Sequence, residues 1–181
     1  MISVDFMLES RNAPVIWRGP MKMNVIKQLL EDVEWGDLEY MVIDCPPGTG
    51  DEPLSVAQLI PEPDGAVIVT TPQELSLSDV RRSIMFCRAL NLPVLGVIEN
   101  MSGFVCSHCG ERTELFGSGG GKAMAGEMDV PFLGELPIER DIVVSGDDGK
   151  PFVYYQGDSP YSIVFEGMVE TIRKRIEDIG T

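Results

Sequence analysis

The stretch EYMVIDCPPGTGD, residues 39–51, joins a short apolar run to an acid and then to a turn rich in Pro and Gly. Met41–Ile43 form the apolar run. Its abrupt end predicts a buried parallel strand that brings Asp44 to the carboxyl edge of a sheet. Ligands bind at that edge in open α/β sheets. The stretch therefore predicts a fold class and a candidate site together.

Asp44 and the turn after it have the chemistry of a nucleotide site. A carboxylate at a strand end can hold Mg²⁺ through water. The backbone N–H groups of Gly48, Thr49 and Gly50 can approach a phosphate closely, because two of the three residues lack a Cβ. This combination is typical of a Walker B strand followed by a switch loop. The alternative is that Asp44 only caps a turn that Pro-Pro-Gly would form without it.

The composition predicts one soluble, cytoplasmic domain. The chain has 181 residues, and 44% of them are hydrophobic, which is ample for one core. No apolar run reaches the ~18 residues that a membrane span needs, and the N-terminus lacks a basic region before an apolar stretch. The net charge of −15 argues against a nucleic acid or a membrane as a main partner. A nucleotide is not excluded, because a few oriented N–H groups bind phosphate inside an acidic protein.

Strands and helices alternate along the chain, which predicts an α/β fold with a doubly wound, mostly parallel sheet. Apolar runs predict strands at 2–8, 41–43, 66–69, 94–98 and 132–136. Helices are expected at 26–33, 53–60, 76–91, 122–128 and from Pro160 onward, with Ser76 and Asp79 as a capping box and Ser159 as an N-cap. The polar insertion at 101–116 interrupts this alternation, and such insertions often carry function.

The insertion contains Cys106-Ser107-His108-Cys109, whose two thiolates can bind one metal centre. Two thiolates are half of a Zn²⁺ or [4Fe–4S] site, and Cys45 and Cys87 lie inside apolar segments. The simplest completion is the same pair from a second subunit about a two-fold axis. His108 is expected to face solvent, and all four cysteines are expected to be reduced. The alternatives are a redox pair, which suits the polar sequence that follows less well, and two idle thiols.

Two further features bear on nucleotide binding. The stretch GSGGGK, residues 117–122, fails the spacing of a phosphate loop, because Phe116 and Ala123 stand where that loop needs Gly and Ser or Thr. It is expected to be a flexible lead into the next helix. Asn100 ends a buried strand, and its carboxamide could read the edge of a base. The alternative for Asn100 is an ordinary turn at a strand end.

Taken together, these residues resemble the Mrp/ApbC family of iron–sulfur cluster carrier ATPases, relatives of MinD and of the nitrogenase iron protein. The resemblance runs from Ile2 to about Tyr155. It rests on WRGPMKM (17–23), DCPPGTGDE (44–52), TPQ (71–73), ENMS (99–102), CxxC (106–109), FGxGGG (116–121) and PFLGELP (131–137). So many matches in the same order make the resemblance specific, and it implies a P-loop NTPase fold.

The resemblance also implies roles for individual residues in binding ATP and Mg²⁺. Asp44 would be the Walker B acid, and residues 48–51 would form switch II, so Asp44 and Asp51 are the candidate catalytic residues. Asn100 would contact the adenine, and the loop after Pro137 would close over the base. The implied nucleotide-binding residues are Gly48, Thr49, Gly50, Asn100 and Pro137.

One departure from the family pattern concerns the N-terminus. The deviant Walker A loop with its lysines, and the switch I aspartate, precede the region where this sequence starts. Residues 1–181 are therefore expected to be the C-terminal two-thirds of a single P-loop domain, with Met1 either an internal methionine of a longer protein or the start of a truncated product. By resemblance the missing strand lies beside the Asp44 strand. The chain is then expected to associate through exposed sheet edges and not to hydrolyse ATP appreciably.

The expected function is that of a carrier which delivers a [4Fe–4S] cluster to apo iron–sulfur proteins. By resemblance, Cys106 and Cys109 would bridge this labile cluster across a homodimer. One rival is a zinc-bridged, dimeric, nucleotide-binding ATPase of the kind that targets membrane proteins. Another is a catalytically inactive scaffold or regulator that kept the surface of the fold and lost its chemistry.

Overall fold

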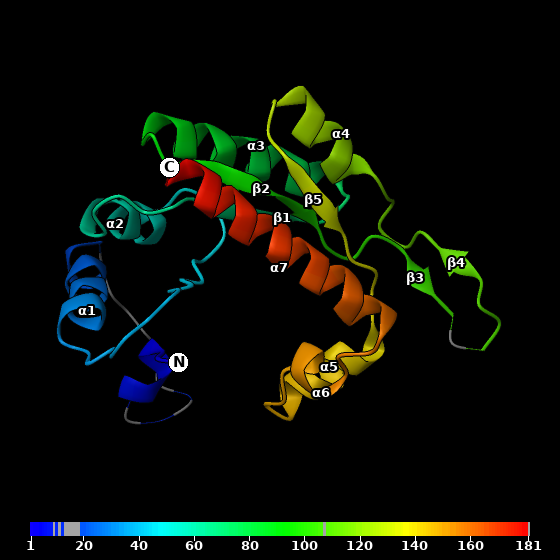
Figure 1. Cartoon of the computed structure of the whole chain (residues 1–181), viewed down its shortest axis with the longest axis horizontal. Coiled ribbons are helices and arrows are strands. Elements are labelled where there is room, and N and C mark those ends of the chain that lie inside the picture. Colours follow the sequence, from blue (N-terminus) through cyan, green and yellow to red (C-terminus); the bar gives the residue numbers. More distant parts are fainter. Residues whose placement is uncertain (9, 11, 13–18, 107, 181) are drawn as a thin grey trace. The chain divides into compact units, whose positions relative to one another are not determined.

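The computed structural model describes residues 1–8, 10, 12, 19–106 and 108–180 (Figure 1). The chain divides into two compact units, Met1–Glu62 and Pro63–Thr181. Each unit is described by itself. Trp17 and Arg18, which begin the first of the family motifs, lie outside the described residues.

The first unit contains a pair of packed helices. It begins with the 3-10 helix η1 (Val4–Met7), followed by α1 (Gly19–Glu31) and α2 (Asp51–Leu59). α1 packs against α2, and Lys22 of α1 forms an ion pair with Glu52 of α2. The helix expected over 53–60 is therefore confirmed, with its start two residues earlier. The helix expected around 26–33 is confirmed as the second half of α1.

Two strands expected in the first unit are wrong. Val4–Met7 form a 3-10 helix where residues 2–8 were expected to be extended, and residues 41–43 form neither a strand nor a helix. The apolar run is exposed rather than buried, with 92% of Val42 open to solvent. A strand is stable only when a neighbouring strand pairs its backbone N–H and C=O groups. The described part of residues 1–62 contains no such neighbour.

The second unit is built on a parallel sheet of three strands in the order β1-β2-β5. The strands are β1 (Ala66–Thr70), β2 (Val94–Glu99) and β5 (Phe132–Glu135), which confirms three of the expected strands and the α/β class. Thr70 pairs with Glu99, and Glu99 pairs with Glu135. The carboxyl ends of all three strands are therefore level with one another.

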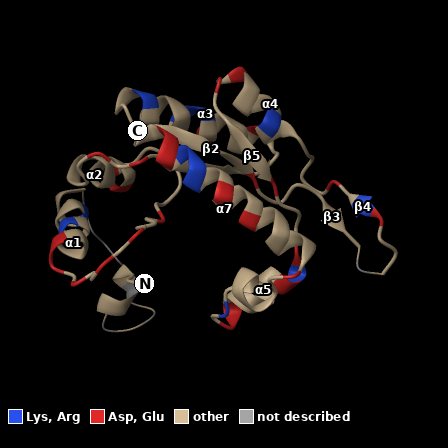
Figure 2. Ribbon diagram, in the orientation of Figure 1, with Lys and Arg blue, Asp and Glu red and all other residues tan. Residues whose placement is uncertain are grey.

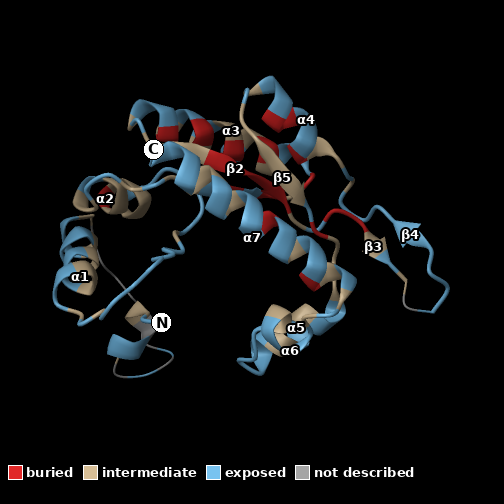
Figure 3. Cartoon of the chain, in the orientation of Figure 1, coloured by how far each residue is buried: buried red, intermediate tan, exposed pale blue. Residues whose placement is uncertain are grey.

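Helices cover both faces of this sheet, as a doubly wound fold requires (Figure 3). On one face α3 (Glu74–Ala89) and α4 (Gly120–Glu127) pack on β1 and β2, and Ile84 and Met124 are fully buried there. On the other face α7 (Pro160–Ile179) packs on β2 and β5, with Met168 against Ile98. Burying a side chain of this size contributes about 1.5–3 kcal/mol.

The starts of α3 and α7 test two capping predictions. Ser159 is the N-cap of α7, since its Oγ accepts a hydrogen bond from the Ser162 N–H at 3.1 Å, and Pro160 follows it. The capping box at Ser76 is wrong, because α3 already begins at Glu74. The Ser76 hydroxyl instead lies 3.0 Å from Thr70 Oγ1, so it ties the helix to the end of β1.

The remaining elements of the second unit lie around the sheet. α5 (Arg140–Asp147) and α6 (Phe152–Tyr155) precede α7. The polar insertion forms an antiparallel hairpin of β3 (Phe104–Val105) and β4 (Arg112–Thr113), which projects from the body of this unit (Figure 1). Among the residues described, no helix has the length and apolar character needed to cross a membrane.

Candidate metal-binding hairpin and nucleotide-binding segments

The switch segment predicted at 44–51 lies in the first unit. Asp44 is exposed in a stretch without regular structure, and Gly48 has φ +94°, a left-handed conformation that favours glycine. Gly50 is the N-cap of α2, and Asp51 is the first residue of that helix. Gly48, Thr49 and Gly50 thus lead into a helix N-terminus, where backbone N–H groups without helical partners favour anions.

Asp51 and its neighbours are anchored to α1. A Cβ built on Gly19 would lie 2.7 Å from Asp51 Oδ2, so the carboxylate approaches the start of α1 as closely as a glycine permits. The next residue, Glu52, forms the ion pair with Lys22, which raises the pKa of Lys22 and lowers that of Glu52. These contacts fix the end of the switch segment that joins α2.

Cys45, inside the same segment, is poorly suited to be a metal ligand. It is half-buried, and its burial raises the pKa of the thiol, an effect to which the carboxylates of Asp44 and Glu52 add. Cys87 is buried in α3, and burial raises the pKa of its thiol too. Both remain protonated thiols at neutral pH, whereas the thiolate is the form that binds metal.

The nucleotide residues predicted in the second unit lie at the carboxyl edge of its sheet. Asn100 follows β2, and its backbone N–H donates to Thr70 O at 2.7 Å. The Asn100 Oδ1 accepts a hydrogen bond from the Met101 N–H at 2.9 Å, so the carboxamide belongs to a turn at the strand end. Pro137 follows the buried Leu136 at the end of β5. Asn100 and Pro137 therefore begin the loops that leave two adjacent strands.

A cavity of about 270 Å³ lies beside Pro137 within the second unit. Its walls are mainly apolar and include Val105, the residue before Cys106, and the rings of Phe152 and Tyr161. These two rings meet edge to face with centroids 5.7 Å apart. The loop after β5 and the cysteine hairpin thus share one apolar cavity.

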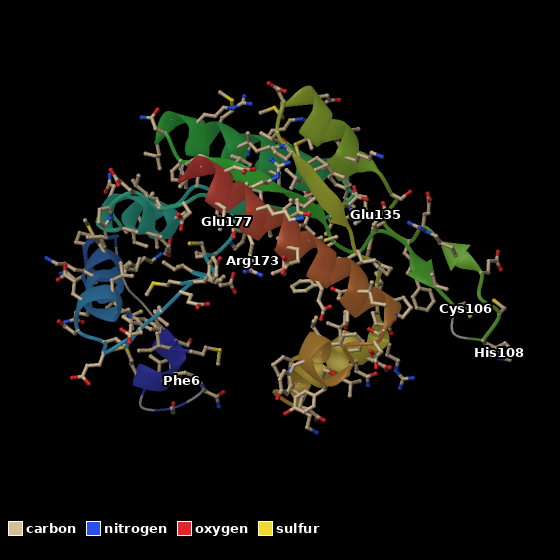
Figure 4. All side chains as sticks on the ribbon, viewed as in Figure 1. Phe6, Cys106, His108, Glu135, Arg173 and Glu177 are labelled. Carbon is tan, nitrogen blue, oxygen red and sulfur yellow. The ribbon has the colours of Figure 1, made fainter. Side chains whose placement is uncertain are left out.

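Cys106 and Cys109 lie between β3 and β4, in the turn of the hairpin. Figure 4 shows Cys106 beyond the end of β3. The Cys106 N–H donates to Glu111 O at 2.9 Å, and the Gly110 N–H donates to Cys106 O at 2.8 Å. Gly110 has φ +73°, which allows the chain to turn back toward β4. Cys109 is exposed and Cys106 is partly exposed, so a cluster or a partner protein can reach both sulfurs.

The turn also changes the pKa of Cys106. Hydrogen bonds from the backbone N–H groups of Cys109 and His108, and then from the Cys109 thiol, lower the pKa of Cys106. A lower pKa increases the fraction of thiolate at neutral pH, and the thiolate is the ligand. Among the residues that the structure describes, no group of three or more His, Cys, Asp and Glu side chains could hold a metal ion. His108 is exposed, as expected.

The root of the hairpin is tied to β5 by a polar network that sequence reasoning missed. Arg112 NH2 donates to Ser102 O at 3.2 Å and lies 3.4 Å from Glu135 Oε1, while the buried Ser102 Oγ donates to Glu135 Oε2 at 3.2 Å. The Ile138 N–H donates to Gly103 O at 2.8 Å. The hairpin is a separate two-stranded sheet, and these contacts fix it to β5 and to the chain that follows β5.

A second missed residue, Glu99, explains the glycine-rich stretch at 117–122. Its carboxylate accepts hydrogen bonds from the backbone N–H groups of Gly119 and Gly121 at the start of α4. The stretch binds a carboxylate of its own chain, and α4 begins inside it at Gly120. The expected lead into a helix at Lys122 is therefore partly helical itself. The sequence held a signal for this contact, namely an acid at the end of a buried strand and three glycines ahead of the next helix.

Comparison with protein families and curated relatives gives one consistent result. A family model described as "ParA: NUBPL iron-transfer P-loop NTPase" matches residues 1–173. The chain is 50% identical over 162 residues to "Cytosolic Fe-S cluster assembly factor NUBP2 homolog" of Nematostella vectensis. This match covers 88% of this chain and 60% of that protein. It is 47% identical over 176 residues to "Iron-sulfur cluster carrier protein" of Methanocaldococcus jannaschii. This match covers 97% of this chain and 60% of that protein. The chain spans about 60% of the length of these relatives.

Solved structures agree with this result. A nucleotide-binding protein from Archaeoglobus fulgidus, in complex with ADP, matches with a TM-score of 0.67 and 41% identity over 79% of this chain and 57% of that one. The cell division ATPase MinD of Pyrococcus furiosus matches with a TM-score of 0.60 over 87% of this chain and 59% of that one. At 23% identity the second match concerns the fold alone.

Proposed function

Since the chain belongs to the family of NUBPL iron-transfer P-loop NTPases, we propose that it carries an iron–sulfur cluster on Cys106 and Cys109 and delivers it to apo-proteins. The cluster is the cargo, and the proposed form is [4Fe–4S]. Relatives named as a cytosolic cluster assembly factor and a cluster carrier support this proposal. The name of the first of these relatives also supports a cytosolic site of action.

The cysteine turn is the observation that carries the proposal. It presents two accessible sulfurs, and the turn itself lowers the pKa of one of them. Soft thiolates are the ligands that iron–sulfur clusters take. A chain with only two of them needs a second chain for a complete site, so the proposed carrier is a homodimer with the cluster between two hairpins.

Sharing the cluster between chains also suits its release. Each chain contributes two iron–sulfur bonds. An incoming thiolate of the recipient can replace Cys109, the exposed ligand, and then Cys106. The step exchanges one thiolate for another at iron, so it needs no oxidant or reductant. The displaced cysteine takes up the proton that the recipient thiol loses.

We further propose that the chain carries nucleotide-binding residues of the family. Asp44 would hold Mg²⁺ through water as the Walker B acid, and Asp51 is the other candidate catalytic carboxylate. Gly48, Thr49 and Gly50 would lie at the phosphates. Asn100 and Pro137 would contact the base. The ADP complex of the Archaeoglobus fulgidus protein supports nucleotide binding in this family. The left-handed Gly48 and the helix N-terminus after Gly50 fit close approach by a phosphate.

Anaerobic reconstitution with iron and sulfide tests the carrier proposal. The wild-type chain should gain visible absorption and bound iron and sulfide, and Cys106→Ser and Cys109→Ser should lose both. Cys45→Ser and Cys87→Ser are matched controls, and they should keep the cluster because these thiols lie outside the turn.

Two results of this experiment would overturn the proposal. A wild-type chain that takes up zinc with the same cysteine dependence and gains no colour would have a zinc bridge, since Zn²⁺ is d¹⁰ and redox-silent. A chain that binds neither metal would act as a scaffold.

A further inference from the structure

Glu99 is a charged side chain at the centre of the sheet that the proposed function leaves without a role. It ends β2, the middle strand, and none of its surface is exposed. A buried carboxylate is costly unless hydrogen bonds satisfy its oxygens. The Gly119 N–H donates to Oε1 at 2.8 Å, and the Gly121 N–H donates to Oε2. Both oxygens therefore have backbone partners at the start of α4.

The cysteine insertion (residues 100–118) leaves and re-enters the fold at this carboxylate. It begins at Asn100, directly after Glu99, and it ends at Ser118, directly before Gly119, the N-cap of α4. The backbone of Glu99 is held on both sides: it pairs with Thr70 of β1, and its C=O accepts from the Leu136 N–H at 2.8 Å. One residue thus joins both ends of the insertion to the sheet.

The glycines that meet Glu99 have the backbone freedom and the space that this closure needs. Gly119 has φ +76°, a conformation that favours glycine. A Cβ on Gly120 would lie 2.5 Å from Pro72 O, and one on Gly121 would lie 2.9 Å from Glu99 Oε2. The start of α4 can therefore lie against the end of the sheet only because these positions lack side chains. The positive end of the helix dipole further favours the carboxylate.

We propose that Glu99 is the positioning residue of the cysteine hairpin. Its carboxylate holds the two ends of the insertion together and thereby determines the positions of Cys106 and Cys109. The inference rests on the proposed cluster-carrier function. Glu99 touches neither sulfur and acts through Gly119 and Gly121. When the two ends of the insertion are held together, the half-sites of two chains meet in one geometry. When the ends separate, the thiols occupy a wider range of positions and hold the shared cluster less firmly.

The test compares Glu99→Gln and Glu99→Asp with wild type. Glu114→Gln is the matched control, because Glu114 is an exposed acid of the same insertion that accepts one hydrogen bond, from Ser118. Two properties of the reconstituted chains are measured: the visible circular dichroism of the cluster and the rate of iron loss to a chelator. Both are recorded at a temperature where far-ultraviolet circular dichroism shows that every variant is folded. Partial unfolding of a variant then cannot account for a change in the spectrum or in the rate of iron loss.

Glutamine offers one acceptor oxygen in place of two, so either Gly119 or Gly121 loses its partner. Iron loss from Glu99→Gln should be about tenfold faster, the factor expected for one hydrogen bond to a buried charged group, and the circular dichroism of the cluster should change. Glu99→Asp keeps the charge with a shorter reach and should lie between wild type and Glu99→Gln. It carries the test if Glu99→Gln does not fold. Glu114→Gln should match wild type.

Wild-type rates and spectra for both Glu99 variants would overturn the inference and leave the carrier proposal intact. Failure of wild type to bind a cluster would overturn the carrier proposal. Amide hydrogen exchange of the cluster-free chain then decides the positioning role, because Cys106 and Gly110 donate hydrogen bonds inside the turn. Their exchange should be about tenfold faster in Glu99→Gln by the same reasoning. Equal exchange in the variant and wild type would overturn the positioning role.

Discussion

Cys106 shows how a short turn changes the chemistry of one residue. The sequence predicts a soft-ligand pair from the spacing of Cys106 and Cys109 alone. The lowered pKa of Cys106 depends on where backbone N–H groups point, and spacing does not encode that direction. Glu99 makes the same point, because only the folded chain shows that Gly119 and Gly121 are its partners. Residue types could be predicted, but their hydrogen-bond partners could not.

The pKa of Cys106 leads to a pH-dependent prediction. A thiol whose pKa is lowered reacts as thiolate at lower pH than one whose pKa is raised, so Cys106 should be alkylated by iodoacetamide at lower pH than Cys45. Mass spectrometry of the labelled peptides across a pH series measures both midpoints.

Cys109→Ala is the control for this pH series. Because the Cys109 thiol is one of the groups that lower the pKa of Cys106, removing it should move the Cys106 midpoint upward. A Cys106 midpoint at or above that of Cys45 would contradict the geometry of the turn.

At the scale of the elements, the outcome of each prediction depends on whether a partner strand is present. Ala66–Thr70, Val94–Glu99 and Phe132–Glu135 pair with one another, and the apolar runs there predict strands correctly. Residues 41–43 are also apolar but have no strand beside them in the described part of their unit, and they form neither a strand nor a helix. An apolar run records a preference for burial, and the partner that buries it is set by the fold.

The core between α3 and the sheet gives a prediction about stability. Ile84 is fully buried, whereas the next residue, Met85, is 54% exposed. Ile84→Ala should therefore lower the free energy of unfolding by about 2–5 kcal/mol. Met85→Ala is the matched control and should change the free energy by no more than about 0.5 kcal/mol.

Denaturant unfolding followed by far-ultraviolet circular dichroism measures both variants. Equal effects of Ile84→Ala and Met85→Ala would mean that α3 does not present this face to the sheet.

At the scale of the whole molecule, charge opposes the dimer that we propose. The net charge is −15, and acidic residues are spread over both units (Figure 2). The family could be predicted from the order of the motifs along the chain, because that order survives even where an expected strand does not form. The single-domain organisation expected from the length stays a prediction.

Repulsion between two acidic chains makes the proposed dimer dependent on salt. Added salt screens like charges, so the dimer formed on cluster binding should be more stable at about 0.2 M than at about 0.02 M ionic strength. Sedimentation velocity of the reconstituted chain at the two salt concentrations measures the change. A dimer that weakens as salt rises would mean that attraction between opposite charges holds the chains together.

Native mass spectrometry of the anaerobically reconstituted chain tests the shared cluster most directly. If Cys106 and Cys109 supply half of the ligands, we expect a species with the mass of two chains and one [4Fe–4S] cluster. The cluster-free chain and the reconstituted Cys109→Ser variant should lack this species. A single chain that retains a complete cluster, or two chains that carry one cluster each, would contradict the claim that the hairpins of two subunits share it.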